Sequence, residues 1–193
     1  MKSIAISGSP RENVGKRDAK ELRYKGLVPA VLYGGDTQYH FAVSAGDLKG
    51  LIYSPDAQFV ELNIDGKQYK AIAQEVQFHP LNEQVVHIDF LQLFDDKVVS
   101  MNIPIKLTGV SPGVRAGGKL TQKLRNLRIK ALPNDIPQFI EVKIGHLEVG
   151  KSVRVEEVKL DKVKVLNNFD DTIVSVVMSR ALRQAEQEAA AAK

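Results

Sequence analysis

The sequence predicts a mainly β protein built from two β-rich modules. Short runs rich in β-branched and aromatic residues follow one another along both halves of the 193 residues, and turn signals such as Asp65-Gly66 separate them. The charge balance changes near residue 95, because the segment 97–134 holds eight basic residues and no acidic one. We therefore expect one domain over residues 1–95 and a second over residues 96–179.

Six strands and two helices are expected in the first module. The strands are expected at residues 3–7, 30–34, 39–43, 58–64, 68–78 and 85–93. The helices are expected at residues 16–25 and 47–52, the second opened by Ser44 or by the Gly46-Asp47 turn. The connections have hairpin length, which disfavours a parallel sheet with long crossover helices.

The second module is predicted to be all β. Its strand-like runs lie at residues 99–107, 124–132, 139–144, 152–158 and 171–178, and Gly- and Pro-containing turns separate them. This pattern is typical of a small β-sandwich. Residues 180–193 are rich in Ala, Gln and charge and have too little apolar surface for a core, so we expect a helical or frayed C-terminal tail there.

The composition excludes several classes of function. With 44% hydrophobic residues the chain can form a core, yet it has no apolar run long enough to span a membrane and no apolar stretch typical of a signal peptide at its start. We expect a cytoplasmic protein with no membrane partner. The absence of cysteine excludes disulfides, thiolate metal sites and thiol catalysis. The net charge of +4 is only mildly basic, so the positions of the charges matter more than their sum.

Two patterns near the N-terminus are typical of phosphate-binding enzymes. The segment "GSPREN" follows a predicted strand and resembles the phosphate-binding loop of flavodoxin-like FMN-dependent reductases, which gives an alternative function. That fold requires parallel strands and crossover helices, which the sequence does not predict. A Walker loop is disfavoured because six residues rather than four separate Gly8 from Gly15-Lys16, and Arg17 replaces the Ser or Thr that would bind magnesium.

A metal site is a third possibility. His79, His87 and Asp89 are potential ligands, but His79 precedes Pro80 in a predicted turn, and no further strong ligand has the spacing to complete a site. We expect no metal and no cofactor.

The helix expected at residues 16–25 separates its charges. At about 100° per residue, Lys16, Lys20 and Arg23 lie on one narrow stripe, with Ala19 and Leu22 beside it. Glu21 can pair with Arg17 and Lys25 at i±4, which would leave the stripe free for an anionic surface. A solvated charged face is the alternative.

The segment "VVHIDF" places two polar groups on one face of a strand. Because side chains alternate, Val86, Ile88 and Phe90 are expected to face the core, while His87 and Asp89 face outward together. Such a pair is typical of an acid/base site, a metal site, a surface that recognises a partner, or the wet side of a half-buried strand.

Longer segments resemble a known family. "GKRDAKELRYKGLVPAVLYGG" and "AIAQEVQFHPLNEQVVHIDF" resemble the N-terminal domain of bacterial large-subunit ribosomal proteins number twenty-five. "GVSPGVRAGGKLTQ" and "NDIPQFIEVKIGHLEVGKSV" resemble the second domain of the longer CTC, or general stress protein, form. The resemblance implies a six-stranded antiparallel β-barrel with a few short helices, followed by a β-rich domain. It also implies a non-enzymatic component of the large ribosomal subunit that binds 5S rRNA and supports translation.

The resemblance also implies which residues contact RNA. The family's positions correspond to Arg11, Lys16, Arg23, Tyr33, His87 and Asp89, and the basic stripe adds Lys20. Phosphates are expected to meet the Lys and Arg residues, whereas His87 and Asp89 are expected to meet base edges or 2′-hydroxyls, with Tyr33 adding stacking or a hydroxyl contact.

The partners of the second module are left open by the resemblance. Neighbouring ribosomal proteins and 23S rRNA are both candidates, and so is a stress-linked role away from the ribosome. The basic residues that could contribute a supplementary electrostatic surface are Arg115, Lys119, Lys123, Arg125 and Arg128, although strand alternation will send some to different faces.

Overall fold

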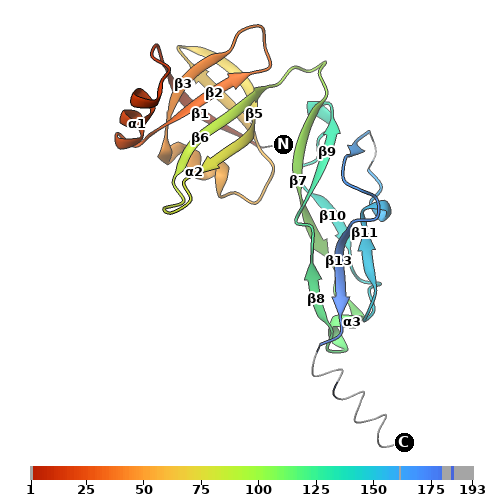
Figure 1. The fold of residues 1–193 in the computed structure, drawn as a ribbon. Helices are drawn as coiled ribbons and strands as arrows, with labels where there is room; N and C mark the ends of the chain where they lie inside the picture. Colours follow the sequence, from red (N-terminus) through yellow and green to blue (C-terminus); the bar gives the residue numbers. More distant parts are fainter. Residues whose placement is uncertain (1, 161, 180–183, 185–193) are drawn as a thin grey trace, which may run out of the picture. The chain divides into compact units, whose positions relative to one another are not determined.

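The computed structural model describes residues 2–160, 162–179 and 184, and within it the chain divides into two compact units. The first unit holds the chain up to Met101 together with Leu132–Gln138, and the second holds Asn102–Ala131 and the chain from Phe139 onward. Figure 1 shows both units in colours that follow the sequence. The tail expected at residues 180–193 lies, apart from residue 184, outside the described residues.

The first unit is a closed six-stranded barrel, as the family resemblance implies. Its strands are β1 (Ser3–Pro10), β2 (Leu27–Tyr33), β3 (Tyr39–Ser44), β4 (Phe59–Ile64), β5 (Lys67–Phe78) and β6 (Val85–Gln92). Around the barrel they run in the order β1-β3-β2-β6-β5-β4. Two helices accompany them, α1 (Lys16–Tyr24) and α2 (Ala45–Ile52), and the Ser44 hydroxyl caps α2 by accepting from the Gly46 N–H at 3.3 Å.

The expectation that all barrel strands are antiparallel is wrong. β1 pairs with β4, and β2 pairs with β6, in parallel orientation, while the other four pairings are antiparallel. Hairpins force the pairs β2–β3, β4–β5 and β5–β6 to be antiparallel. The two parallel pairs join strands that are far apart in the chain, so no tight turn dictates their direction.

The barrel core contains a stacked pair of aromatic rings. The rings of Phe41 and Phe90 lie with centroids 5.9 Å apart and an interplanar angle of 28°. Gly8, in β1, faces this pair so closely that a Cβ at this position would lie 2.4 Å from Phe41 Cδ2. The glycine of "GSPREN" is therefore explained by packing, since residues 8–10 belong to a strand and not to a loop that begins a helix.

The second unit contains two small sheets. Its strands are β7 (Val99–Thr108), β8 (Lys119–Gln122), β9 (Asn126–Ala131), β10 (Ile140–Lys143), β11 (Ser152–Arg154), β12 (Lys164–Val165) and β13 (Thr172–Val177). One sheet has the order β10-β7-β9-β12 and the other β11-β13-β8. Buried and exposed residues alternate along β9 and β10, which gives each strand one apolar and one polar face.

The predicted turn at residues 109–118 contains a structured element. A one-turn helix, α3 (Pro112–Arg115), lies there, and its cap is the buried Ser111. The Ser111 hydroxyl donates to the Leu147 carbonyl at 2.5 Å and accepts from the Val114 N–H at 3.4 Å. The strand expected at residues 152–158 is shorter than predicted, because a 3-10 helix, Val155–Glu157, follows β11.

Candidate nucleic-acid interface

The strand β6 alternates as its sequence predicts from His87 to Phe90. Ile88 and Phe90 have no exposed surface and belong to the barrel core, whereas His87 and Asp89 point outward with side-chain exposures of 26% and 29%. Before His87 the prediction is wrong: Val85, expected to face outward, packs against the barrel core, and Val86 is not among the residues that do. The β5–β6 register shifts at this point, so the alternation is interrupted. The two polar side chains therefore share the outer surface of a rigid strand.

His87 and Asp89 contact each other directly. The distance from His87 Nδ1 to Asp89 Oδ1 is 2.8 Å, a hydrogen bond in which the imidazole donates to the carboxylate. A histidine that donates through Nδ1 keeps Nε2 available for an outside partner, as an acceptor when neutral and as a donor when protonated. The second oxygen of Asp89 can accept from another donor.

Neighbouring strands add polar groups to this surface. Across the β5–β6 pair, Glu75 lies opposite Asp89 and Gln77 lies opposite His87, and both β5 residues are exposed. On the other side, the β2–β6 register brings Tyr33 opposite Leu91. We call Tyr33, Glu75, Gln77, His87 and Asp89 the reading face. Glu75 and Gln77 are not among the predicted site residues, because their register depends on a bulge between Ala73 and Glu75 that the sequence does not reveal.

The carboxylates of this face affect the pKa of Tyr33. Burial, then the charge of Asp89, then that of Glu75, raise the pKa of Tyr33 above its ordinary value of 10.0. Tyr33 therefore stays a neutral phenol that can donate a hydrogen bond. The reading face as a whole is polar and acidic, with one imidazole and no lysine or arginine among its five members.

The helix α1 presents its basic stripe to solvent. Lys16, Lys20 and Arg23 are exposed, whereas Ala19 and Leu22 are half-buried, in agreement with the predicted faces of the helix. The Lys20 ammonium lies 5.8 Å from the centroid of the Tyr24 ring, a cation–π contact on the surface. We call Lys16, Lys20 and Arg23 the basic stripe.

Glu21 has one of the two helix partners that were expected. Its carboxylate lies 3.9 Å from Arg17 Nε, and no ion pair between Glu21 and Lys25 is present among the described residues. Both Arg17 and Glu21 are strongly exposed, so this pair contributes little to stability.

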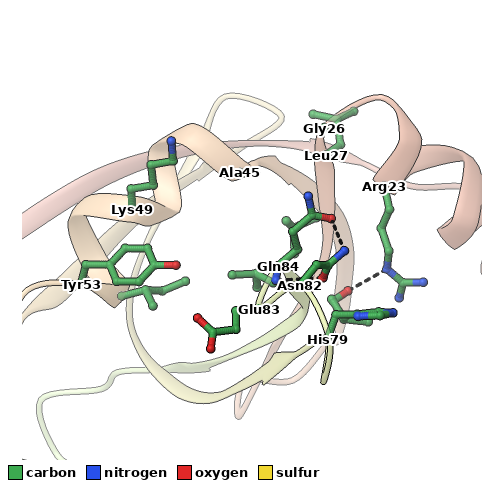
Figure 2. Close-up of a pocket in the computed structure, with 14 residues that line it drawn as sticks. Arg23, Gly26, Leu27, Ala45, Lys49, Tyr53, His79, Asn82, Glu83 and Gln84 are labelled. Atoms are coloured by element: carbon green, nitrogen blue, oxygen red, sulfur yellow. Dashed lines mark hydrogen bonds between the residues drawn. The ribbon is translucent and has the colours of Figure 1, made fainter.

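Arg23 connects the basic stripe to β6. Its Nε donates to the Val86 carbonyl at 3.0 Å, one residue before His87, and this bond is dashed in Figure 2. The terminal nitrogens of the guanidinium have no bond to the protein in the described structure and can reach an outside anion. One hydrogen bond thus fixes a cation beside the reading face.

Arg23 also lines a hollow of about 430 Å³ on the barrel. The hollow lies between α2, the start of β2 and the loop that joins β5 to β6, as Figure 2 shows. Lys49 contributes from α2 and Tyr53 from the position directly after it. The loop contributes Asn82, whose amide donates to Gln84 Oε1 at 3.2 Å. The lining does not include His87 or Asp89, so the hollow and the reading face are separate surfaces. Arg23 is next to both, because it lines the hollow and bonds to β6 one residue before His87.

Arg11 has a local partner that the sequence does not predict. Its Nη2 and Nε donate to Asp18 Oδ2 at 2.5 and 3.2 Å, and the Arg11 side chain is only 9% exposed. The Arg11 N–H also donates to the His40 carbonyl at 2.9 Å. Arg11 therefore attaches the first turn of α1 to the barrel and orients this helix.

The contacts of His79 do not support the metal-site alternative. His79 accepts from the Leu81 N–H through Nδ1 at 3.3 Å, which is a turn contact, and no group of three potential metal ligands occurs in the described part of the chain. No helix among the described residues has the length and apolar character needed to cross a bilayer. The fold and the site define a protein whose polar groups lie on an open, convex surface, an arrangement suited to a macromolecular partner.

Comparison with known proteins identifies the family. Residues 6–90 match the Ribosomal L25p family, and residues 98–180 match the C-terminal domain of ribosomal protein TL5. The chain is 48% identical over 193 residues, the full length of both chains, to the large ribosomal subunit protein bL25 of Cytophaga hutchinsonii. It is 45% identical to the same-named protein of Amoebophilus asiaticus, with 98% of this chain and 96% of the relative covered. The identity is 41% for the protein of Porphyromonas gingivalis, with coverages of 96% and 97%.

The chain belongs to the L25 family of ribosomal proteins. It is therefore a ribosomal protein and not an enzyme, so the flavin-dependent reductase alternative is wrong. The mixed barrel also lacks the doubly wound parallel sheet that such a reductase requires.

Proposed function

We propose that this protein binds 5S rRNA as a structural component of the large ribosomal subunit in the cytoplasm. In this proposal the reading face contacts base edges and 2′-hydroxyls, and the basic stripe contacts phosphates. The observation that carries the proposal is the bond between Arg23 and the Val86 carbonyl, because it holds a phosphate-binding cation next to the His87–Asp89 pair.

The chemistry of the reading face favours RNA grooves over bare phosphate. Carboxylates repel phosphates, so Glu75 and Asp89 need partners that donate, such as base amino groups and 2′-hydroxyls. The wide, shallow minor groove of A-form RNA exposes such groups to side chains on the outer surface of a strand. Gln77 and the neutral Tyr33 phenol add groups that can donate.

The roles of the predicted residues follow from their contacts. Lys16, Lys20 and Arg23 neutralise phosphates and set the register of the protein on the RNA. His87 and Asp89 form one hydrogen-bonded unit that recognises a groove edge, and Tyr33 lies beside it. Arg11 positions α1 through Asp18 and adds a partly screened positive charge.

The domain boundary near residue 95 enters the same proposal. Residues 1–95 contain all seven predicted RNA-contacting residues and all six barrel strands, so they carry the 5S rRNA interaction. The second domain contacts another part of the large subunit, either 23S rRNA or a neighbouring protein.

A nuclease-protection experiment tests the proposal. The full chain should protect a segment of 5S rRNA and should sediment with large ribosomal subunits. The variant Asp89→Ala should lose protection at the groove edge, while Glu61→Ala, which removes an exposed carboxylate from β4 on the same barrel, should not. Absence of a protected 5S rRNA segment for the parent chain would refute the proposal.

A further inference from the structure

The four-stranded sheet of the second unit has a basic outer face. Along β9, Leu127 and Ile129 are buried while Arg128 and Lys130 are exposed, and along β10 the exposed residues are Glu141 and Lys143. The pairing of β12 with β9 places Lys164 opposite Lys130. Paired residues lie on the same side of a sheet, so these cations share one surface.

Four of these cations have no side-chain partner in the described structure. They are Arg128, Lys130, Lys143 and Lys164, which we call the sheet-face cations. Lys106, on β7, lies on the same side but stacks over the Phe139 ring, with Nζ 3.8 Å from its centroid. Glu141, opposite Lys106, is the one carboxylate on the described residues of these four strands.

The second sheet of this unit provides an internal contrast. Its outward residues include three hydroxyls, Ser152, Thr121 and Ser175, which lie side by side across β11, β13 and β8. Its cations are Arg154, which is paired with Asp170 at 3.4 Å, and Lys119 at the start of β8. On the described residues, the face of the four-stranded sheet therefore gathers more cations without a side-chain partner than the three-stranded sheet does.

The structure also separates the basic residues noted in the sequence. Arg115 ends α3, Lys119 begins β8, and Lys123 lies in the connection between β8 and β9. Only Arg128 belongs to the basic sheet face. The other sheet-face cations come from outside the acid-free run or from its end, and only the strand pairing brings them together.

We propose that the sheet-face cations bind the phosphate backbone of double-stranded RNA in the large ribosomal subunit. This inference rests on the proposed ribosomal function for the source of the RNA. Cations lie about 5 Å apart across paired strands and about 7 Å apart along one strand, on a rigid support. Such a surface neutralises neighbouring phosphates. Phe139, the aromatic residue directly before β10, is half-buried and covered by the Lys106 ammonium, so its ring is not free to stack on unpaired bases, which favours a duplex over a single strand.

Two triple variants, each of which removes three positive charges, test this inference. One full-length variant carries Arg128→Gln, Lys130→Gln and Lys164→Gln, and the control carries Arg115→Gln, Lys119→Gln and Lys123→Gln, all at exposed positions. The probes are a 20-base-pair RNA duplex of unrelated sequence (about two helical turns), large subunits stripped of this protein, and isolated 5S rRNA. Melting curves check that both variants fold like the parent.

The sheet-face variant should bind the duplex about tenfold more weakly at low salt, with a slope of log K against log salt that is shallower by about 2. It should also bind stripped subunits more weakly, and the control variant should match the parent on both probes. Replacement by Arg128→Lys, Lys130→Arg and Lys164→Arg should restore binding, because the charge is kept.

Two results would overturn the inference. In the first, the sheet-face variant binds the duplex as well as the control does. In the second, it loses subunit attachment but keeps duplex binding, which would mean that the face meets a protein. Binding of isolated 5S rRNA by the parent chain reports separately on the proposed function, because the reading face lies on the barrel.

Discussion

The reading face of the barrel and the basic face of the four-stranded sheet use the same pleated geometry with opposite charge. The reading face has two carboxylates, an amide, a phenol and an imidazole. The sheet face has four unpaired cations and a single carboxylate. Groups of the first kind discriminate among donors and acceptors, whereas cations attract any phosphate. In our proposals the barrel combines discrimination by the reading face with adhesion by the basic stripe, whereas the second unit contributes adhesion alone.

The largest expected effect comes from the two cores. Ile88→Ala in the barrel and Ile129→Ala in the second unit each truncate a fully buried side chain and should each lower the free energy of unfolding by about 2–5 kcal/mol. Denaturant unfolding of the full chain measures this loss. Only Ile88→Ala should also weaken 5S rRNA binding, because Ile88 lies between His87 and Asp89. Loss of 5S rRNA binding by a folded Ile129→Ala protein would break the comparison.

The second effect concerns the groups of the reading face. His87→Ala or Asp89→Ala should weaken 5S rRNA binding by about 1–3 kcal/mol, or roughly 5- to 150-fold, because hydrogen-bonding groups on the RNA are left without a partner. The salt dependence should stay nearly constant, and the melting temperature should change little, since both side chains are outside the core. Glu61→Ala is the control. If Asp89→Ala unfolds the protein while the folded fraction still discriminates RNA, the strand is structural.

The third effect tests the division of labour between the units. A fragment of residues 1–95 should fold and bind 5S rRNA within about tenfold of the full chain, or ~1.4 kcal/mol. It should fold less stably than the barrel in the full chain, because Leu132–Gln138, which belongs to the barrel unit, is missing. Titration of labelled 5S rRNA with both proteins measures the difference. A folded fragment without any binding would refute the assignment.

The fourth effect separates adhesion from discrimination within the barrel. Lys16→Ala or Arg23→Ala should make the slope of log K against log salt shallower by about 0.7–0.9 for each lost phosphate contact, while the preference for 5S rRNA over an unrelated RNA stays. Binding isotherms over a salt series provide the slope. Arg17→Ala is the matched control, because Arg17 lies off the basic stripe and next to Glu21. An unchanged slope for Lys16→Ala would indicate a solvated helix face.

The smallest effect is a change in the titration of one tyrosine. A raised pKa means that folded Tyr33 holds its proton more tightly than the unfolded chain does. Its contribution to stability is therefore present below pH 10 and is lost as the pH rises through the folded pKa. Asp89→Asn should lower the pKa of Tyr33 part of the way, since burial is the larger cause. Alkaline absorbance titrations of the parent, Asp89→Asn and Tyr33→Phe proteins would detect this, and an unchanged titration would separate Tyr33 from Asp89.

The sequence predicts what depends on local pattern. The alternation from His87 to Phe90, the faces of α1 and the six barrel strands to within three residues at each end are all local properties, and the structure agrees with them. The first residues of β2 are missed because Pro29 lies in a strand. Parallel pairing, the Arg11–Asp18 contact and the positions of Glu75 and Gln77 depend on residues far apart in the chain or on a bulge, so periodicity cannot reveal them.

The parallel pairing of β2 with β6 decides when the barrel can be completed during synthesis. It joins Ala30 to Ile88 and Val31 to Asp89, pairs with a long sequence separation, so the seam cannot form until the last barrel strand has left the ribosome that makes it. Tyr33 meets Asp89 only at that moment. A nascent chain that ends before β6 thus carries the basic stripe without His87 and Asp89. Closure of the barrel is therefore the step that assembles the reading face from β2, β5 and β6.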